Sequence, residues 1–427
     1  MLGKTVFGLL ALLTVTLAAA VAASAQGEEP GESIGGTLFQ RIDGERVPVE
    51  GVVIVVSQDG TEIGSATSDA EGTWLVQLPG PGSYSVRLDE STLPEDVGLT
   101  DPDRTELPDI NVTSGQDRQV IFQLGESALE QPGTFTRVAA LFVVGLKLGA
   151  IIALCAIGLS LIFAVTGLVN FAHAELVTLG AVIAYLLHAA GPHWPLVAAA
   201  VPAVIAGAFL GWGQEKVLWK PLRRRRMGLL SMMVVSIGVG FALRFLILIF
   251  YGGRPRAYPD FAGQAATPIL GIPVVPKQLV TIGVAVAVLG AVGLFLQKTQ
   301  AGTALRAVRD DSALAESSGI DAQRVIALTW AMGGALAAMG GVFFGLTESV
   351  QWDMGFQLLL LMFAAVILGG IGTTYGTMAG AFIVGVAVEM SVLFVPSELK
   401  TAVGLVLLII VLIFRPQGLL AVRERIS

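Results

Sequence analysis

The chain has 427 residues, of which 54% are hydrophobic and only 14% are charged. A soluble domain is about one-quarter charged, so this composition excludes an ordinary soluble protein. The net charge of -7 comes mostly from acidic residues before residue 131, and it does not indicate nucleic acid as a partner. The single cysteine, Cys155, lies in an apolar run, which excludes an intrachain disulfide framework and a thiolate metal cluster.

Residues 1–25 have the pattern of a signal peptide. One early cation, Lys4, precedes the apolar run 6–23, and the small residues Ala23-Ser24-Ala25 form a cleavage pattern. An uncleaved membrane anchor is the alternative interpretation. Both interpretations predict that the segment that follows is exported.

Residues 34–125 are predicted to form an exported β-sandwich domain. Apolar residues alternate in VVIVV at 52–56, and turn signals such as Asp59-Gly60 separate short strand-like segments. The segments PVEGVVIVV, TSDAEGTW and LPGPGSYSV resemble carboxypeptidase regulatory-like, prealbumin-like modules. Asp69 and Glu71 leave a calcium site open, although turn-forming, solvated carboxylates are the favoured interpretation. A linker is predicted at 126–137.

Nine apolar segments after this linker are long enough to cross a bilayer, which takes about 20 residues of helix. The predicted fold is therefore a multi-span α-helical membrane protein with an N-terminal all-β domain, and the membrane domain covers 138–427. The spans are predicted at 138–164, 174–190, 196–215, 229–251, 278–296, 325–347, 356–372, 376–395 and 399–414. The first span is open to a break, with 166–175 entering the membrane as irregular backbone.

The charges between the spans predict the orientation of the chain. If the β domain is exported, nine spans place the Arg-rich loop 220–226, the polar loop 297–324 and the tail 415–427 in the cytoplasm. The positive-inside rule independently predicts the same arrangement. The loop 252–277 then lies outside, where its two arginines are a mild exception.

The polar loop 297–324 has the pattern of two short helices. Apolar residues recur at helical spacing after Gly302, Asp311 or Ser312 can cap a second helix with Glu316 near a capping-box position, and Gly319 can end that helix. A solvated loop between spans is the alternative. A docking surface for a partner is the favoured interpretation.

Four segments, in the same order, resemble the branched-chain amino acid ABC transporter permease family over residues 138–427. They are GLVNFAHAELVTLGA at 167–181, GTALRAVRDDSALAESSGIDAQRVIAL at 302–328, LGGIGTTYGTMAGAFIVG at 368–385 and RPQGLL at 415–420. The loop itself resembles the coupling motif of ABC importer permeases, a short cytoplasmic helix that fits a groove on an ATPase. The resemblance implies a coupling surface that contains Arg306, Asp310, Asp311, Glu316 and Gly319.

The same resemblance implies the partners of the chain. They are a second permease subunit that completes the pore, two cytoplasmic ATPase subunits that bind the ATP, an extracellular solute-binding protein, and membrane lipid. No cofactor is implied for the chain itself. The fused β domain is outside the usual family pattern, and contact with the binding protein or the cell envelope is its suggested role.

Polar residues inside the predicted spans are the candidates for the transport pathway, because such residues are costly in lipid. Asn170, His173 and Glu175 lie between two apolar runs, where they can line a polar path or satisfy backbone groups at a helix break. Arg244 and Glu389 are predicted at similar depth in two other spans. That depth favours either an ion pair between them or an Arg244 side chain that extends alone to the outer interface.

The sequence contains no GxxxxGK[ST] phosphate loop, no zinc-spaced His/Cys cluster and no nucleophile elbow, so no enzyme activity is predicted. We predict the permease subunit of an ABC importer for branched-chain or related small amino acids, located in the cytoplasmic membrane. An autonomous ion-coupled transporter or channel is the alternative, and a membrane anchor for the β domain is a third. Urea, amides and polar amino acids stay open as solutes.

Overall fold

The computed structural model describes residues 32–42, 45–58, 60–94, 97, 105–112, 117–120, 122, 124, 134–261, 264, 266–269, 271–396, 399–414 and 418. The chain divides into two compact units, one of Gln26–Gly133 and one of Thr134–Ser427 together with Met1–Ala25. The predicted signal peptide and residues 126–133 of the predicted linker lie outside the described residues.

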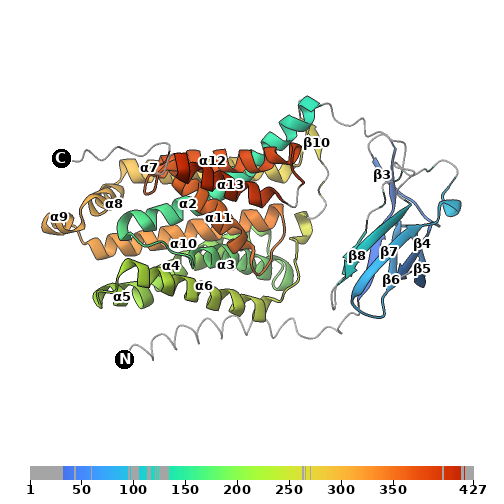
Figure 1. Ribbon diagram of the computed structural model, residues 1–427, viewed down its shortest axis with the longest axis horizontal. Coiled ribbons are helices and arrows are strands. Elements are labelled where there is room, and N and C mark those ends of the chain that lie inside the picture. The colour runs from blue at the N-terminus through green and yellow to red at the C-terminus, as the bar shows by residue number, and fades with distance from the viewer. Residues whose placement is uncertain are drawn as a thin grey trace. The chain divides into compact units, whose positions relative to one another are not determined.

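The described part of the N-terminal unit is mostly β-strands, as the sequence predicts, with one short 3-10 helix, η1 (Glu90–Thr92). One antiparallel sheet has the strand order β5-β4-β7-β8, a second, mixed sheet has the order β6-β1-β9, and β2 and β3 form a separate hairpin. Figure 1 shows β4 to β8 in this unit. The strands are β1 (Ser33–Thr37), β2 (Phe39–Ile42), β3 (Glu45–Pro48), β4 (Val53–Gln58), β5 (Thr61–Thr67), β6 (Thr73–Gln77), β7 (Gly82–Leu88), β8 (Glu106–Val112) and β9 (Asp117–Gln119).

The two sheets of this unit share one apolar core. Ile54 and Val56 of β4 are buried in one sheet, and Trp74 and Val76 of β6 are buried in the other, and all four belong to a single apolar cluster. Successive side chains of a strand point to opposite faces, so each sheet has one face in this shared core. Asp69 accepts hydrogen bonds from two backbone amides of its own turn, as the turn interpretation requires.

The second unit is a bundle of apolar helices. Seven helices are long and apolar enough to cross a membrane: α2 (Thr134–Thr166), α3 and η2 (His173–Ala190), α4, η3 and α5 (Leu196–Arg224), α6 (Leu229–Tyr251), α7 (Pro276–Lys298), α10 (Ala322–Thr347), and α12 with η5 (Thr374–Leu393). Two shorter apolar helices are α11 (Met354–Gly369) and α13 (Lys400–Phe414). Within the described residues, these nine helices correspond one to one to the nine predicted spans.

The helix α2 is the most enclosed element of this bundle and contacts α7, α10, α11 and α12. It begins at Thr134, four residues inside the predicted linker, so the helix is longer than the predicted first span. Its approach to α10 is close because both helices have glycine at the contact: a Cβ on Gly158 would lie 2.7 Å from the Gly333 carbonyl oxygen. Small residues of this kind let membrane helices pack backbone to backbone.

A break separates α2 from α3 inside the bundle. The helix α2 is continuous to Thr166, and the chain is then non-helical over 167–172, with a positive φ of 66° at Gly167. His173, the first residue of α3, hydrogen-bonds the carbonyl of Cys155, eleven residues before the end of α2. At 1.5 Å per residue the segment therefore folds back about 16 Å along α2. The expected irregular backbone is present, but α2 itself is unbroken and Glu175 is helical.

The helix α11 begins beside the same break. Its Gly355 amide donates to Thr178 Oγ1 at 3.1 Å, and a Cβ on Gly355 would clash with the Ala174 carbonyl. Two helices, α3 and α11, therefore start at one place within the bundle. Helix N-termini carry a partial positive charge and unsatisfied amide groups, so this place attracts polar and anionic groups.

The connections between the spans lie at two ends of the bundle. Figure 1 shows α5, α8 and α9 at one end of the helical unit and β10 at the other. The loop at the second end contains η4 (Pro259–Phe261), β10 (Thr267–Ile269) and β11 (Ile272–Val274). Tyr258 anchors this loop, because its hydroxyl donates to the Ala181 carbonyl at 3.1 Å. Burial raises the pKa of Tyr258 well above its ordinary value, so this hydroxyl stays protonated and able to donate.

Candidate functional site

Three polar side chains at the α2–α3 break are fully buried: Asn170, His173 and Glu175. Asn170 Oδ1 accepts from the Ala172 amide at 3.1 Å, and His173 Nε2 lies 3.0 Å from the Cys155 carbonyl oxygen. Asn170 therefore satisfies a backbone amide at the break, and His173 joins the break to the middle of α2. Each of the three also has a buried polar atom without a partner among the described residues, namely Asn170 Nδ2, His173 Nδ1 and Glu175 Oε2.

Glu175 forms an ion pair with Arg244 of α6. Arg244 Nη2 and Nε lie 2.8 Å and 3.0 Å from the same carboxylate oxygen, Glu175 Oε1. The side chain of Arg244 is only 9% exposed and that of Glu175 is fully buried. A desolvated pair of this kind is held by geometry as much as by charge, since both ions lose their hydration.

Arg244 also contacts aromatic rings. Its guanidinium carbon lies 3.9 Å from the centroid of the Phe356 ring at the start of α11, and 5.3 Å from that of Phe241, one turn earlier on α6. Cation–π contacts stabilise a desolvated arginine. One side chain therefore connects α6 to the starting turns of both α3 and α11.

The two predictions for Arg244 are wrong. Arg244 is not paired with Glu389, and it does not extend alone to the outer interface. Counting residues along a span gave the depth of Arg244 but could not show that the fold-back of 167–172 raises Glu175 to that depth. Glu389 is instead 3.2 Å from Lys400, the first residue of α13.

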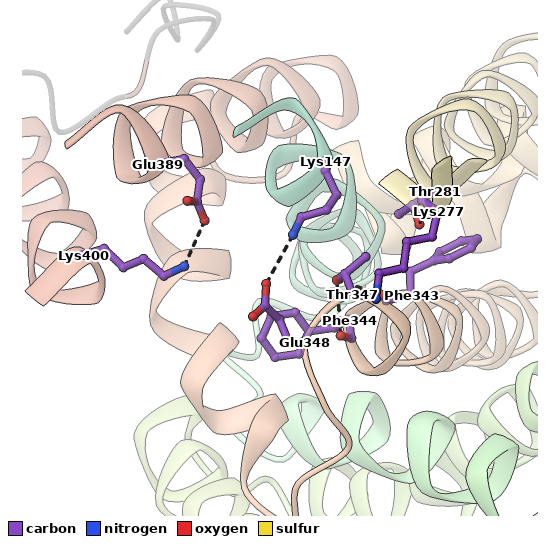
Figure 2. A network of polar contacts seen from close by, with 9 residues as sticks. All are labelled: Lys147, Lys277, Thr281, Phe343, Phe344, Thr347, Glu348, Glu389 and Lys400. Carbon is purple, nitrogen blue, oxygen red and sulfur yellow. Dashed lines mark hydrogen bonds and ion pairs between the residues drawn. The ribbon is translucent and has the colours of Figure 1, made fainter. Parts of the chain in front are cut away.

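A second pair lies at the end of α10. Lys147 of α2 is 3.2 Å from Glu348, which directly follows α10, and the two side chains are 5% and 45% exposed. Figure 2 shows this pair together with Glu389 and Lys400, each carboxylate pointing toward its lysine. Our sequence reasoning overlooked Lys147, although a lysine inside a predicted span is itself the signal for a charged partner.

The polar loop 297–324 forms two helices, as predicted: α8 (Gln300–Asp310) and α9 (Ser312–Ser317). Asp311 caps α9 by accepting from the amides of Ala313 and Leu314, and Gly319 follows α9 with a φ of 87°. Glu316 is the fifth residue of α9, too far along for a capping box, so that detail of the prediction is wrong.

The residues assigned to the coupling surface fall into two groups. Arg306 contacts α7, because its guanidinium donates to the Leu296 carbonyl near the end of that helix. Asp311 is used as the cap. Asp310 and Glu316 are exposed, and between them lies Leu314, a 64% exposed apolar residue that the sequence reasoning did not single out.

Within the described ranges, no group of three or more His, Cys, Asp or Glu side chains is placed to hold a metal ion. The site at the break instead combines a cation, an anion, two helix starts and aromatic rings. This is the set of groups that can recognise a small molecule with separate charged ends and an apolar body.

Comparison with known proteins gives the family. The family model described as "Branched-chain amino acid transport system / permease component" matches residues 141–412. The high-affinity branched-chain amino acid transport system permease protein LivH of Salmonella typhimurium is 33% identical over 288 residues, which cover 65% of this chain and 93% of LivH.

LivH of Escherichia coli K12 has the same identity and coverage. The high-affinity branched-chain amino acid transport system permease protein BraD of Pseudomonas aeruginosa is 32% identical over 293 residues, which cover 65% of this chain and 93% of BraD. No solved structure shows significant similarity to the chain. The family model matches well over half of the chain and includes all nine apolar helices in whole or in part. The chain therefore belongs to the family of branched-chain amino acid transport system permease components.

Proposed function

We propose that this chain is the permease subunit of an importer that moves branched-chain or related small amino acids across the cytoplasmic membrane. A separate ATPase binds the ATP and drives the importer, and the chain itself has no enzyme activity. Family membership supports this proposal, as does the similarity to LivH and BraD, which are branched-chain amino acid transport system permease proteins. The observation that carries it is the buried Glu175–Arg244 pair at the point where α3 and α11 begin.

The pair suits the two charged ends of an amino acid. Glu175 Oε2 has no partner among the described residues and accepts a hydrogen bond from the ammonium group of the solute. Arg244 uses Nε and Nη2 on Glu175, so Nη1 is left to bind the carboxylate. The positive helix starts beside it favour the same anion.

Aromatic side chains next to the pair suit an apolar solute body. Phe241 and Phe245 of α6 are 47% and 52% exposed, and Phe356 of α11 is 39% exposed. We propose that this uncovered face of α6 and α11 meets a second permease subunit. The pathway then runs between the two subunits, and Arg244 lies at its wall.

The helix α9 is the proposed contact with the ATPase. Its exposed Leu314, with Asp310 and Glu316 on either side, offers an apolar centre and a charged rim. The helices α8 and α9 form a hairpin, here called the coupling hairpin, that contacts α7. Arg306 of α8 donates to the Leu296 carbonyl of α7, and Gly302 of α8 lies against the same residue. Movement of α9 by the ATPase is therefore passed to a membrane span.

The proposed orientation places α8, α9 and the arginines 223–226 in the cytoplasm and the β unit outside. The co-location of α5, α8 and α9 at one end of the helical unit supports this proposal, as does the positive-inside rule (Figure 1). We also propose that residues 1–25 are a signal peptide and that a solute-binding protein contacts the chain from outside. Cysteines at Ser317 and Ser83, both exposed, should react with a membrane-impermeant reagent from opposite sides.

A reconstitution experiment tests the proposed function. The full chain, a second permease, the ATPases and the binding protein are placed in vesicles, and uptake of labelled leucine is measured with and without ATP. Uptake should require the ATPases and ATP, and a pH gradient alone should drive none. Uptake by the chain alone, driven by a pH gradient, would instead establish the autonomous ion-coupled transporter.

A further inference from the structure

A cavity of about 520 Å³ lies between the end of α4 and the start of α10. The walls come from α4 with η3 (Glu215–Trp219) and α5 (Lys220–Arg224) on one side, and from the first turns of α10 on the other. Its polar lining includes Trp212, Lys216, Lys220, Gln323 and Arg324. The cavity is next to α9 in the chain, since α10 begins five residues after α9 ends.

The charges that line the cavity do not cancel. Glu215 is paired with Arg223, and Asp321 is paired with Arg324 at 2.9 Å. Neither Lys216 nor Lys220 forms an ion pair within 4.0 Å among the described residues, although Lys220 interacts electrostatically with Glu215 and the Lys216 ammonium lies 4.0 Å from the centroid of the Trp212 ring. Two cations therefore remain for an anionic ligand.

More positively charged side chains follow Lys220 in the sequence. The chain has four consecutive arginines at 223–226, and the last three are exposed. Charges of one sign near a cleft raise the local concentration of ligands with the opposite sign. The cavity therefore favours an anion such as a phosphate ester.

An uncovered apolar stripe on α4 leads into the cavity. It consists of four side chains spaced one helical turn apart, all at least half exposed: Val197, Val201, Ile205 and Phe209. The opposite face of α4 is packed on α10 through Gly207 and Gly211. The stripe extends about 18 Å at 1.5 Å per residue, more than half of a ~30 Å hydrocarbon core, so its part nearer the cavity, Ile205 and Phe209, lies at the depth of one leaflet's acyl chains.

The order of side chains along this face follows the depth profile of a bilayer leaflet. Apolar residues come first, Trp212 lies at the boundary, and Lys216 and Lys220 come last. Tryptophan and lysine are the residues that mark the membrane–water interface. A soluble phosphate ester would use the cations but not the stripe.

We propose that this cavity binds the phosphate of an anionic phospholipid, with Lys216 and Lys220 as the cationic ligands and an acyl chain along the α4 stripe. The ring of Trp212 holds the Lys216 ammonium at the cavity wall. The lipid bridges α4 and α10 at the root of the coupling hairpin. This places a lipid requirement next to the surface that receives the ATPase.

Native mass spectrometry of the full-length chain, purified with its partner subunits, tests the proposal. Phosphatidylglycerol or phosphatidylcholine is titrated into the wild type, into the double variant Lys216→Gln/Lys220→Gln, and into Lys298→Gln. Lys298 is the control because it is an exposed lysine at the last residue of α7, outside the cavity.

The wild type should bind phosphatidylglycerol more tightly than phosphatidylcholine. The double variant should lose about 25-fold in phosphatidylglycerol affinity, or about fivefold for each cation, and Lys298→Gln should be unchanged. The pair Lys216→Arg/Lys220→Arg should retain binding, which separates loss of charge from loss of fold.

Three results would overturn the proposal. The first is equal binding of the two lipids by the wild type. The second is displacement of the lipid by glycerol phosphate at comparable concentration, which would identify a site for soluble phosphate esters. The third is unchanged lipid binding by the double variant together with loss of the ATPase subunits, which would make the cavity part of the ATPase interface.

Discussion

Three ion pairs of the membrane unit show two kinds of environment. Glu175 and Arg244 are enclosed at the helix break, and both are nearly inaccessible. Lys147–Glu348 and Glu389–Lys400 lie at helix ends, and in each pair one partner is at least one-third exposed (Figure 2). An exposed partner keeps part of its hydration, whereas an enclosed pair depends entirely on its protein partners. Enclosure, more than the number of ion pairs, therefore marks the proposed transport site.

The largest effect is expected from Arg244→Gln. This change leaves Glu175 buried without its cation, which costs about 3–5 kcal/mol in comparable buried pairs. Thermal unfolding of the purified chain should show a strong loss of stability, and leucine uptake should be abolished. Stability equal to that of the wild type would show that the pair is not enclosed as described.

The double variant Glu175→Gln/Arg244→Met sharpens this comparison. Replacement of both charges removes the unpaired ion, so much of the stability lost in Arg244→Gln should return. Uptake should stay absent, because both of the proposed charged ligands for the solute are gone. Unfolding and uptake are measured on the same preparations. A double variant that regains uptake would remove the pair from the transport pathway.

A smaller effect is expected from Gly319→Val, which changes the coupling hairpin and leaves both kinds of pair intact. The φ of 87° is costly for a β-branched residue, about 1–3 kcal/mol, while no atom lies near enough for a Cβ to clash. Leucine-stimulated ATP hydrolysis should fall, with normal membrane insertion. Gly319→Asn is the matched control, since asparagine tolerates positive φ, and it should keep most of the coupling. Equal activity in both variants would contradict the role of this turn.

The smallest effect is expected from Lys400→Gln. Lys400 is 35% exposed, so solvent reaches its pair with Glu389, and the loss in the free energy of unfolding should be smaller than in Arg244→Gln. Uptake should remain close to that of the wild type, because Lys400 is not part of the proposed transport site. Loss of uptake as complete as in Arg244→Gln would erase the distinction between the two kinds of pair.

The sequence predicted the parts of this molecule that depend on local pattern. The nine apolar helices follow from run length, the two short helices of 297–324 follow from Asp311 and Gly319, and the all-β unit follows from alternation. Asn170, His173, Glu175 and Arg244 were all singled out because polar groups are costly in lipid. Such predictions need no knowledge of which helices are neighbours.

The pairing of those residues depends on tertiary contacts and was not predictable in the same way. Equal depth in two spans suggested that Arg244 pairs with Glu389. In the structure α6 contacts α3 at the break, and Glu389 pairs with Lys400 between α12 and α13. Depth along a helix says nothing about rotation or neighbours. The fold-back of 167–172, which lifts Glu175 to Arg244, depends on packing against α2.

The central claim is that the solute passes beside Arg244. The most direct test is whether the solute protects one nearby cysteine from alkylation. Phe241→Cys lies one turn before Arg244 on the uncovered face of α6, and Val234→Cys, 59% exposed on the same helix, is the control. The native Cys155 is fully buried and should not react. In the assembled importer with ATP, leucine and binding protein, alkylation of Phe241→Cys should slow, while alkylation of Val234→Cys should not change. Equal alkylation rates of Phe241→Cys with and without leucine would contradict the claim.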